Sequence, residues 1–233
     1  MCTDPPVRGA PPPPPGAGAS DGRARRPRAD DGLFIVGLVG RAGSGKSTVA
    51  RALAADGARV IEADRLGHEV TDGDPEVRAA LAAEYGADVY RPDGALDRAR
   101  VAARVFADPE ARARLDRLVH PRIVERIRRT LDAWRAAGHR GVVVVDAALM
   151  LEWGLERACD AIVAVTAPEE EQVARLAAAR GWTPEQARAR LAAQRTNERF
   201  AAAADAVLDN RGSPEDLARA ARDAVARLRA ARA

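Results

Sequence analysis

A nine-residue segment of the chain carries the residue types that hold a phosphate chain. Glycines at fixed spacing let successive backbone N–H groups turn inward toward phosphate oxygens, and a helix that starts there adds the positive end of its dipole. Lys46 can reach the β- and γ-phosphates of ATP, and the Ser47 hydroxyl can ligate Mg²⁺. The pattern predicts ATP and Mg²⁺ binding, against the alternative of an ordinary glycine-rich turn. The segment reads Gly40-Arg41-Ala42-Gly43-Ser44-Gly45-Lys46-Ser47-Thr48 and matches G-x-x-x-x-G-K-[ST].

Lys46 is the only lysine of the chain. Lysine and arginine together account for 37 residues, and all of them except Lys46 are arginine. A chain that uses arginine throughout has kept its single ammonium group where a phosphate site needs a compact point charge. This coincidence argues against a chance match to the motif.

Two aspartates follow predicted strands and are candidates for chemistry beside this segment. Asp64 comes after the strand expected at 59–63, and Asp146 comes after the apolar run 142–145. Ligands of open parallel sheets bind beyond the carboxyl ends of the strands, so both aspartates should face the edge that carries the phosphate segment. Asp64 can accept a proton from a substrate hydroxyl or help to hold Mg²⁺, or it can simply cap a helix that starts at Arg65. Asp146 has the form of a Walker B aspartate, which would help to hold Mg²⁺.

These residues need a scaffold in which strands alternate with helices. Five apolar runs read as strands, and helical sequence separates them. That alternation predicts a three-layer α/β fold with one five-stranded parallel sheet. The helical stretch at about 65–138 exceeds an ordinary crossover, so we expect it to be an inserted subdomain. The predicted strands are 33–39, 59–63, 142–145, 161–165 and 206–208.

Composition narrows the class of protein. The 37 Lys and Arg residues are mixed along the chain with 34 Asp and Glu residues, which is typical of solvated helix faces, whereas a nucleic-acid binder would cluster its basic residues. No apolar run is long enough to span a membrane, and the two cysteines lack a metal or redox spacing. We therefore expect a cytoplasmic protein without nucleic-acid or membrane partners, either a monomer or a weak homo-oligomer. Residues 1–31, rich in Pro, Gly and Arg, are expected to be a disordered tail before a domain at 32–233.

The motifs of the folded part resemble those of the dephospho-coenzyme A kinase family. The resemblance spans about residues 33–229 and keeps the motifs in the order of the family. It implies a P-loop kinase fold with a helical insertion for the acceptor and a lid at about 172–200. The matching segments are 37–47, 61–64 (IEAD), 118–123 (LVHPRI), 149–152 (LMLE), 172–180, 190–194 (RLAAQ) and 204–212 (ADAVLDNRG).

The resemblance also implies an activity. The γ-phosphoryl group of ATP would be transferred to the 3′-hydroxyl of the ribose of dephospho-coenzyme A, giving coenzyme A and ADP, the last step of coenzyme A biosynthesis. Lys46 and the loop amides would hold the β- and γ-phosphates, Ser47 would hold Mg²⁺, and Asp64 would orient and deprotonate the acceptor hydroxyl. Arg175 and Arg180 would stabilise the transferring group, a task that suits the planar guanidinium.

The remaining implied roles concern the two substrates. The helical insertion would bind dephospho-coenzyme A, and within it His120 is expected to be structural rather than catalytic. Asp209 and Asn210 would border the adenine of the nucleotide.

Several residues depart from the usual pattern of the family. Val39 stands where the family usually has Thr, Arg41 and Ala42 where it has Gly-Ile, Glu62 where it has Asp, and Ala148 where it has Pro. Two alternatives stay open. One is a P-loop kinase that acts on another nucleotide, nucleoside or small metabolite, which screening of substrates tests. The other is a nucleotide-binding module without turnover, which the departures at Val39 and Arg41 keep open.

Overall fold

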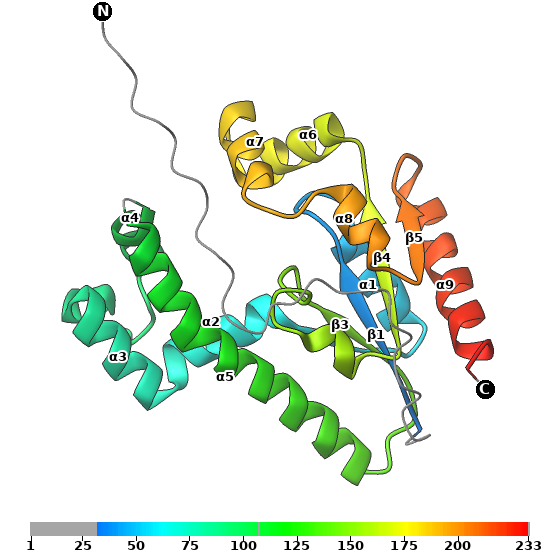
Figure 1. Ribbon diagram of the computed structural model, residues 1–233, viewed down its shortest axis with the longest axis horizontal. Helices are drawn as coiled ribbons and strands as arrows, with labels where there is room; N and C mark the ends of the chain where they lie inside the picture. Colours follow the sequence, from blue (N-terminus) through cyan, green and yellow to red (C-terminus); the bar gives the residue numbers. More distant parts are fainter. Residues whose placement is uncertain (1–31, 107, 233) are drawn as a thin grey trace, which may run out of the picture.

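Five parallel strands form one sheet at the centre of the molecule (Figure 1). The computed structural model describes residues 32–106 and 108–232, so the tail expected at 1–31 lies outside the described residues. The strands are ordered β2-β3-β1-β4-β5, and each pairing between them is parallel. The prediction of a five-stranded parallel sheet is confirmed. The strands are β1 (Leu33–Val39), β2 (Arg59–Glu62), β3 (Gly141–Asp146), β4 (Ala161–Thr166) and β5 (Ala206–Asp209).

Helices connect the strands and cover both faces of the sheet. In chain order they are α1 (Lys46–Ala55), α2 (Ala63–Gly73), α3 (Pro75–Tyr85), α4 (Arg98–Phe106), α5 (Pro109–Ala136), α6 (Glu169–Arg180), α7 (Pro184–Ala192), α8 (Asn197–Ala202) and α9 (Pro214–Ala230), with short 3₁₀ turns η1 (Ala87–Val89) and η2 (Leu155–Ala158). α1 and α9 pack against each other on one face of the sheet. None of the helices in the described part of the chain has the length and apolar content needed to cross a membrane.

β1 is the central strand, and both of its faces are buried. Successive side chains of a strand point to opposite faces, so its residues enter two different hydrophobic cores. Phe34 and Leu38 pack in the core beneath α1 and α9. Ile35 and Val39 enter the core on the other face, which extends into the helices between β2 and β3. Burial on both faces explains why β1 reads as an uninterrupted apolar run.

The helices between β2 and β3 form a group to one side of the sheet, and the long helix α5 carries them back to it (Figure 1). Apolar residues such as Leu81 and Ile127 give this group a core that is continuous with the sheet. An ion pair of 3.0 Å between Arg98 Nη2 and Asp72 Oδ2 joins α4 to α2. The Tyr85 hydroxyl donates a hydrogen bond to the carbonyl oxygen of Ala111 over 2.6 Å and joins α3 to α5.

The segment between β4 and β5 is divided into three helices. We expected helical sequence over about 168–204, and local signals break it twice. Gly181 ends α6 in the left-handed conformation, with a φ of 66°. Thr183 then opens α7 with a capping box, and Thr196 caps α8 through its side chain. Figure 1 shows α6 and α7 standing beyond the carboxyl end of β4, above the start of α1.

Candidate site for nucleotide binding and phosphoryl transfer

The phosphate segment forms the turn between β1 and α1. Gly43 and Gly45 both have positive φ, 73° and 107°, which favours glycine. A Cβ atom on Gly43 would lie 2.8 Å from the carbonyl oxygen of Gln172, and one on Gly45 would lie 2.4 Å from Asn210 Nδ2. Only glycine fits at these two positions, because α6 and the loop after β5 press against the turn.

Backbone N–H groups of the turn divide into engaged and open groups. The Ser44 N–H donates to the Arg41 carbonyl oxygen over 3.2 Å, and the Ala42 N–H donates to Gln194 Oε1 over 2.9 Å. No side chain within the described residues caps the amino end of α1. A helix end with open N–H groups and no capping side chain is an anion site. Among the described residues, no acceptor takes the N–H groups of Gly43, Gly45, Lys46 and Ser47.

Lys46 and the carboxylates gather at the carboxyl ends of β2 and β3. The Lys46 ammonium donates to the Gly40 carbonyl oxygen over 3.1 Å. Asp146 is the last residue of β3, and its Cα pairs in register with that of Glu62 on β2. Burial raises the pKa of Asp146; the positive charge of Lys46 opposes this, and the negative charges of Asp64 and Glu62 add to it. The parallel sheet therefore brings Asp64 and Asp146 to the edge that carries Lys46, as the sequence predicted.

Asp64 lies in the first turn of α2, and its side chain is exposed. The helix begins at Ala63, two residues before the start at Arg65 that the alternative interpretation assumed. Its N-cap is Glu62, which makes no capping hydrogen bond through its side chain. The interpretation of Asp64 as the N-cap of a helix starting at Arg65 is therefore wrong, because β2 passes into α2 without an intervening loop. Asp64 is left as an exposed carboxylate at the edge of the sheet.

The two predicted arginines occupy different places on α6. Arg175 lies between the turn and the loop after β5. It donates to the Gly43 carbonyl oxygen over 3.2 Å and to the Asn210 carbonyl oxygen over 3.3 Å. It also forms an ion pair of 2.6 Å with Glu171. Arg180 is exposed at the far end of the helix, and no described residue bonds to its side chain there.

The loop after β5 holds the turn from the other side. Asn210 is buried, and its Nδ2 donates to the Ser44 carbonyl oxygen over 2.8 Å. Asp209 instead faces solvent and pairs with Arg211 over 2.7 Å. Within α1, the hydroxyl of Thr48, the last residue of the phosphate segment, accepts a long hydrogen bond of 3.5 Å from Arg51. Of the residues expected around the nucleotide base, Asn210 is the one that braces the phosphate turn directly.

Sequence reasoning missed two contacts of this site. Arg41 was expected in the phosphate segment, but its partner was not: its side chain is only 8% exposed and pairs with Glu169 over 2.8 Å. Its Nε is buried, and no described residue accepts a hydrogen bond from it. Gln194 bonds the turn through Ala42 from 152 positions away in the chain. The resemblance of 190–194 to a family element pointed to Gln194, but not to its partner.

His120 is packed in a way that suits a structural role. Its ring lies 5.0 Å from that of Trp153, centroid to centroid, and its Nε2 lies 3.3 Å from Asp116 Oδ1. Burial lowers the pKa of His120; the nearby charges of Asp116 and Glu152 raise it and that of Arg112 lowers it. His120 thus joins α5 to the segment that follows β3.

Two hollows lie near these elements. One of about 570 Å³ opens beside β5, and its walls include Arg41, Thr166, Asn197 and Asp209. That volume lies in the range of small-molecule sites.

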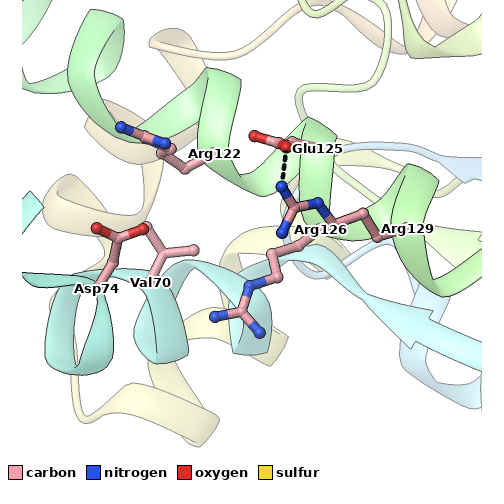
Figure 2. Close-up of a pocket in the computed structure, with 6 residues that line it drawn as sticks. All are labelled: Val70, Asp74, Arg122, Glu125, Arg126 and Arg129. Atoms are coloured by element: carbon pink, nitrogen blue, oxygen red, sulfur yellow. Dashed lines mark hydrogen bonds and ion pairs between the residues drawn. The ribbon is translucent and has the colours of Figure 1, made fainter. Parts of the chain in front are cut away.

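The second hollow, of about 90 Å³, lies between α2 and α5, where Figure 2 shows the side chains of three arginines pointing in different directions. It is too small for a nucleotide, and ion pairs with Glu76 and Glu125 already engage two of its arginines, Arg122 and Arg129.

The residues present fit a nucleoside triphosphate with its metal ion. The turn closes a cradle in which a Cβ atom at Gly43 or Gly45 has no room. Four open N–H groups and the ammonium of Lys46 supply positive potential for phosphate oxygens. The exposed Ser47 hydroxyl and the Asp146 carboxylate are hard oxygen donors, which Mg²⁺ prefers.

Known proteins share both the sequence and the fold. The model of the family "Dephospho-CoA kinase" matches residues 34–216. Dephospho-CoA kinases of Thermobifida fusca and Anaeromyxobacter dehalogenans are 45% and 43% identical, over 79% and 86% of this chain and 91% and 94% of those proteins. The crystal structure of TT1252 from Thermus thermophilus has a TM-score of 0.69 and 35% identity, over 84% of this chain and 98% of that one. The dephospho-CoA kinase from Campylobacter jejuni, 20% identical with a TM-score of 0.59 over 84% of this chain and 97% of that one, shares the fold.

Proposed function

The chain belongs to the dephospho-CoA kinase family, and from this premise we propose how it phosphorylates dephospho-coenzyme A with ATP. The observation that carries the proposal is the open phosphate cradle at the start of α1, with Lys46 inside it and Asp64 and Asp146 at the same edge of the sheet. Both groups that a phosphoryl transfer needs, a phosphate clamp and a carboxylate next to it, are thus supplied by one edge.

The cradle would hold ATP by its phosphates. The open N–H groups of the turn would bind phosphate oxygens, and Lys46 would exchange its bond to the Gly40 carbonyl oxygen for the β- and γ-phosphates. Arg175, already between the turn and Asn210, would contribute positive charge beside the nucleotide. Ser47 and Asp146 would hold Mg²⁺, which neutralises phosphate charge when it is bound.

Asp64 would act on the acceptor. Its exposed carboxylate can accept a hydrogen bond from the 3′-hydroxyl of the ribose and hold it in line with the γ-phosphorus. The acceptor oxygen bonds to this phosphorus while the bond from phosphorus to the β–γ bridging oxygen breaks. ADP leaves with that electron pair, and the hydroxyl proton passes to Asp64. The products are coenzyme A and ADP.

The helical segments would complete the site. We assign acceptor binding to the insertion at about 65–138, because its first helix, α2, carries Asp64 in its first turn. We assign the role of a lid to about 172–200, because α6 and α7 stand over the phosphate turn and a closed lid would keep water from the transferring group (Figure 1). Arg180, exposed at the end of α6, would reach the phosphoryl group only if this helix moved toward the acceptor.

A product assay tests this function. The protein is incubated with ATP, Mg²⁺ and dephospho-coenzyme A, and both ADP and coenzyme A are quantified. We expect equal amounts of the two products. Adenosine, AMP and simple sugars serve as competing acceptors in parallel reactions. Faster transfer to any of them would favour a different small-molecule kinase, and ATP binding without any product would favour a module that lacks turnover.

A further inference from the structure

Both ends of the segment that carries α6 and α7 are attached to consecutive residues of the phosphate turn. At the entry, Glu169 pairs with Arg41 over 2.8 Å, and the Arg41 side chain is almost fully buried. At the exit, Gln194 Oε1 accepts the N–H of Ala42 over 2.9 Å. The turn is therefore gripped at positions 41 and 42 by two residues that are 25 positions apart in sequence.

The entry and the exit are also bonded to each other. Gln172, which is fully buried, donates through Nε2 to Asn197 Oδ1 over 3.3 Å. Asn197 Nδ2 in turn donates to the Ala167 carbonyl oxygen over 2.9 Å. These bonds make one unit of residues 167–172 and 194–197, which we call the lid base. Arg195 in this unit forms an ion pair with Glu152, in the segment after β3.

The bond from Gln194 has a specific effect on the cradle. It occupies the Ala42 N–H, so the open N–H groups of the turn are those of Gly43, Gly45, Lys46 and Ser47. Ala42 precedes Gly43, whose positive φ sets the direction of those groups. A side chain that fixes the Ala42 N–H therefore fixes the turn relative to the lid base.

We propose that Gln194 is a positioning residue, which holds the lid base on the phosphate turn so that α6 and α7 exclude water from the γ-phosphoryl group. The proposal rests on the transfer reaction proposed above. Gln194 does not touch the reacting atoms in this role; it acts through Ala42 and through the helices that it anchors. Its loss should let water compete with the acceptor hydroxyl, because lids protect a reactive group only when they are held in place.

The ratio of ADP to coenzyme A measures this competition directly. Transfer to the acceptor yields one of each, whereas transfer to water yields ADP and phosphate alone. Gln194→Met keeps the length of the side chain and removes the acceptor atom. We expect this variant to raise the ratio from near one to above about two, with kcat for coenzyme A lowered about tenfold, since small misplacements are costly in rate. Gln194→Glu restores an acceptor for the Ala42 N–H and should keep the ratio near one, while its negative charge raises KM for ATP.

A control variant within the same helices separates this role from general weakening. Arg188→Met removes an exposed ion pair of 2.9 Å between α7 and Glu170 that does not involve the phosphate turn, and its ratio should stay at the wild-type value. Glu169→Gln weakens the other attachment and should raise the ratio, which keeps the proposal testable even if Gln194→Met folds poorly.

The proposal is overturned if the ratio is unchanged in Gln194→Met, or in Glu169→Gln where Gln194→Met does not fold. It is also overturned if Gln194→Glu raises the ratio as much as Gln194→Met does. Absence of coenzyme A in the wild-type reaction would instead refute the proposed function.

Discussion

Asp146 lies in register with Glu62 across the parallel pair β2 and β3, so two carboxylates stand side by side where the sheet meets the phosphate cradle. Burial raises the pKa of Asp146, and the charge of Glu62 adds to this effect. In the nucleotide-free protein this arrangement costs stability. The folded state binds the proton more tightly than the unfolded chain does, so stability is lost as pH rises from the unfolded pKa through the higher folded pKa.

Asp146→Asn should therefore stabilise the nucleotide-free protein at neutral pH while harming function. We expect Tm at pH 7 to rise by roughly 2–4 °C, the change that about 1 kcal/mol causes in a domain of this size. The gain should shrink as pH falls below about 4, where the aspartate becomes neutral in the unfolded chain as well. The stabilisation of the variant by ATP with Mg²⁺ should be smaller than that of wild type. Thermal melts over this pH range test it, with the exposed Asp223→Asn on α9 as a control; a lower Tm at pH 7 contradicts the assignment.

Lys46→Ala should abolish transfer and leave the fold intact. Lys46 is partly exposed, and its one side-chain bond to the described residues goes to the Gly40 carbonyl oxygen, so its removal should change Tm little. We expect kcat to fall by at least about 10²-fold, because the ammonium group stabilises charge in the transition state. Lys46→Arg should restore little, since a planar guanidinium does not replace a point charge in a tight cradle. A folded Lys46→Ala protein with normal kcat would exclude the cradle as the nucleotide site.

Asp64→Asn tests the proposed base. Asp64 is exposed and does not cap α2, so its replacement should leave Tm and ATP affinity close to those of wild type. The amide keeps the shape but cannot take a proton, and kcat should fall by roughly 10²-fold, within the range of a general base. The measurements are steady-state kinetics and nucleotide titration of the same preparation. If kcat is unchanged, the proton leaves by another path.

Asn210→Ala should weaken both stability and nucleotide binding. The variant removes the donor to the Ser44 carbonyl oxygen in a buried position, a loss expected to cost about 1–3 kcal/mol of unfolding free energy. The released turn should also raise KM for ATP several-fold. Denaturant unfolding and kinetics measure the two effects. Arg211→Ala, at the exposed neighbouring position, is the control and should change neither by much; a similar loss in that variant would point to the loop as a whole.

The sequence was informative where chemistry depends on neighbours in the chain. The spacing of Gly40, Gly45 and Lys46 predicts the cradle because a turn between a strand and a helix is a local structure. Asp64 and Asp146 could be placed at one edge because parallel strands share their carboxyl ends.

The sequence was uninformative where a contact depends on how distant elements pack. Nothing near Arg41 indicates that Glu169 will pair with it, and nothing near Gln194 indicates Ala42 as its partner, since each bond spans more than a hundred positions. For the two predicted arginines of α6, the motif did not indicate which side of the helix each would occupy. Arg180 follows Arg175 by five residues, which turns it about 140° around the helix and away from the phosphate turn.

The solitary lysine has a consequence for chemical modification. Acyl donors and other amine-directed reagents usually meet many lysine side chains on a protein surface, and their effects are spread among them. Here the amine of Lys46 is the only lysine target in the chain, beside the terminal α-amine, and it belongs to the phosphate cradle. Acetylation of this one side chain would remove its charge and so impair phosphate binding by the cradle. Bound ATP would protect the amine from the reagent. The stoichiometry of labelling with and without nucleotide would therefore count occupied cradles.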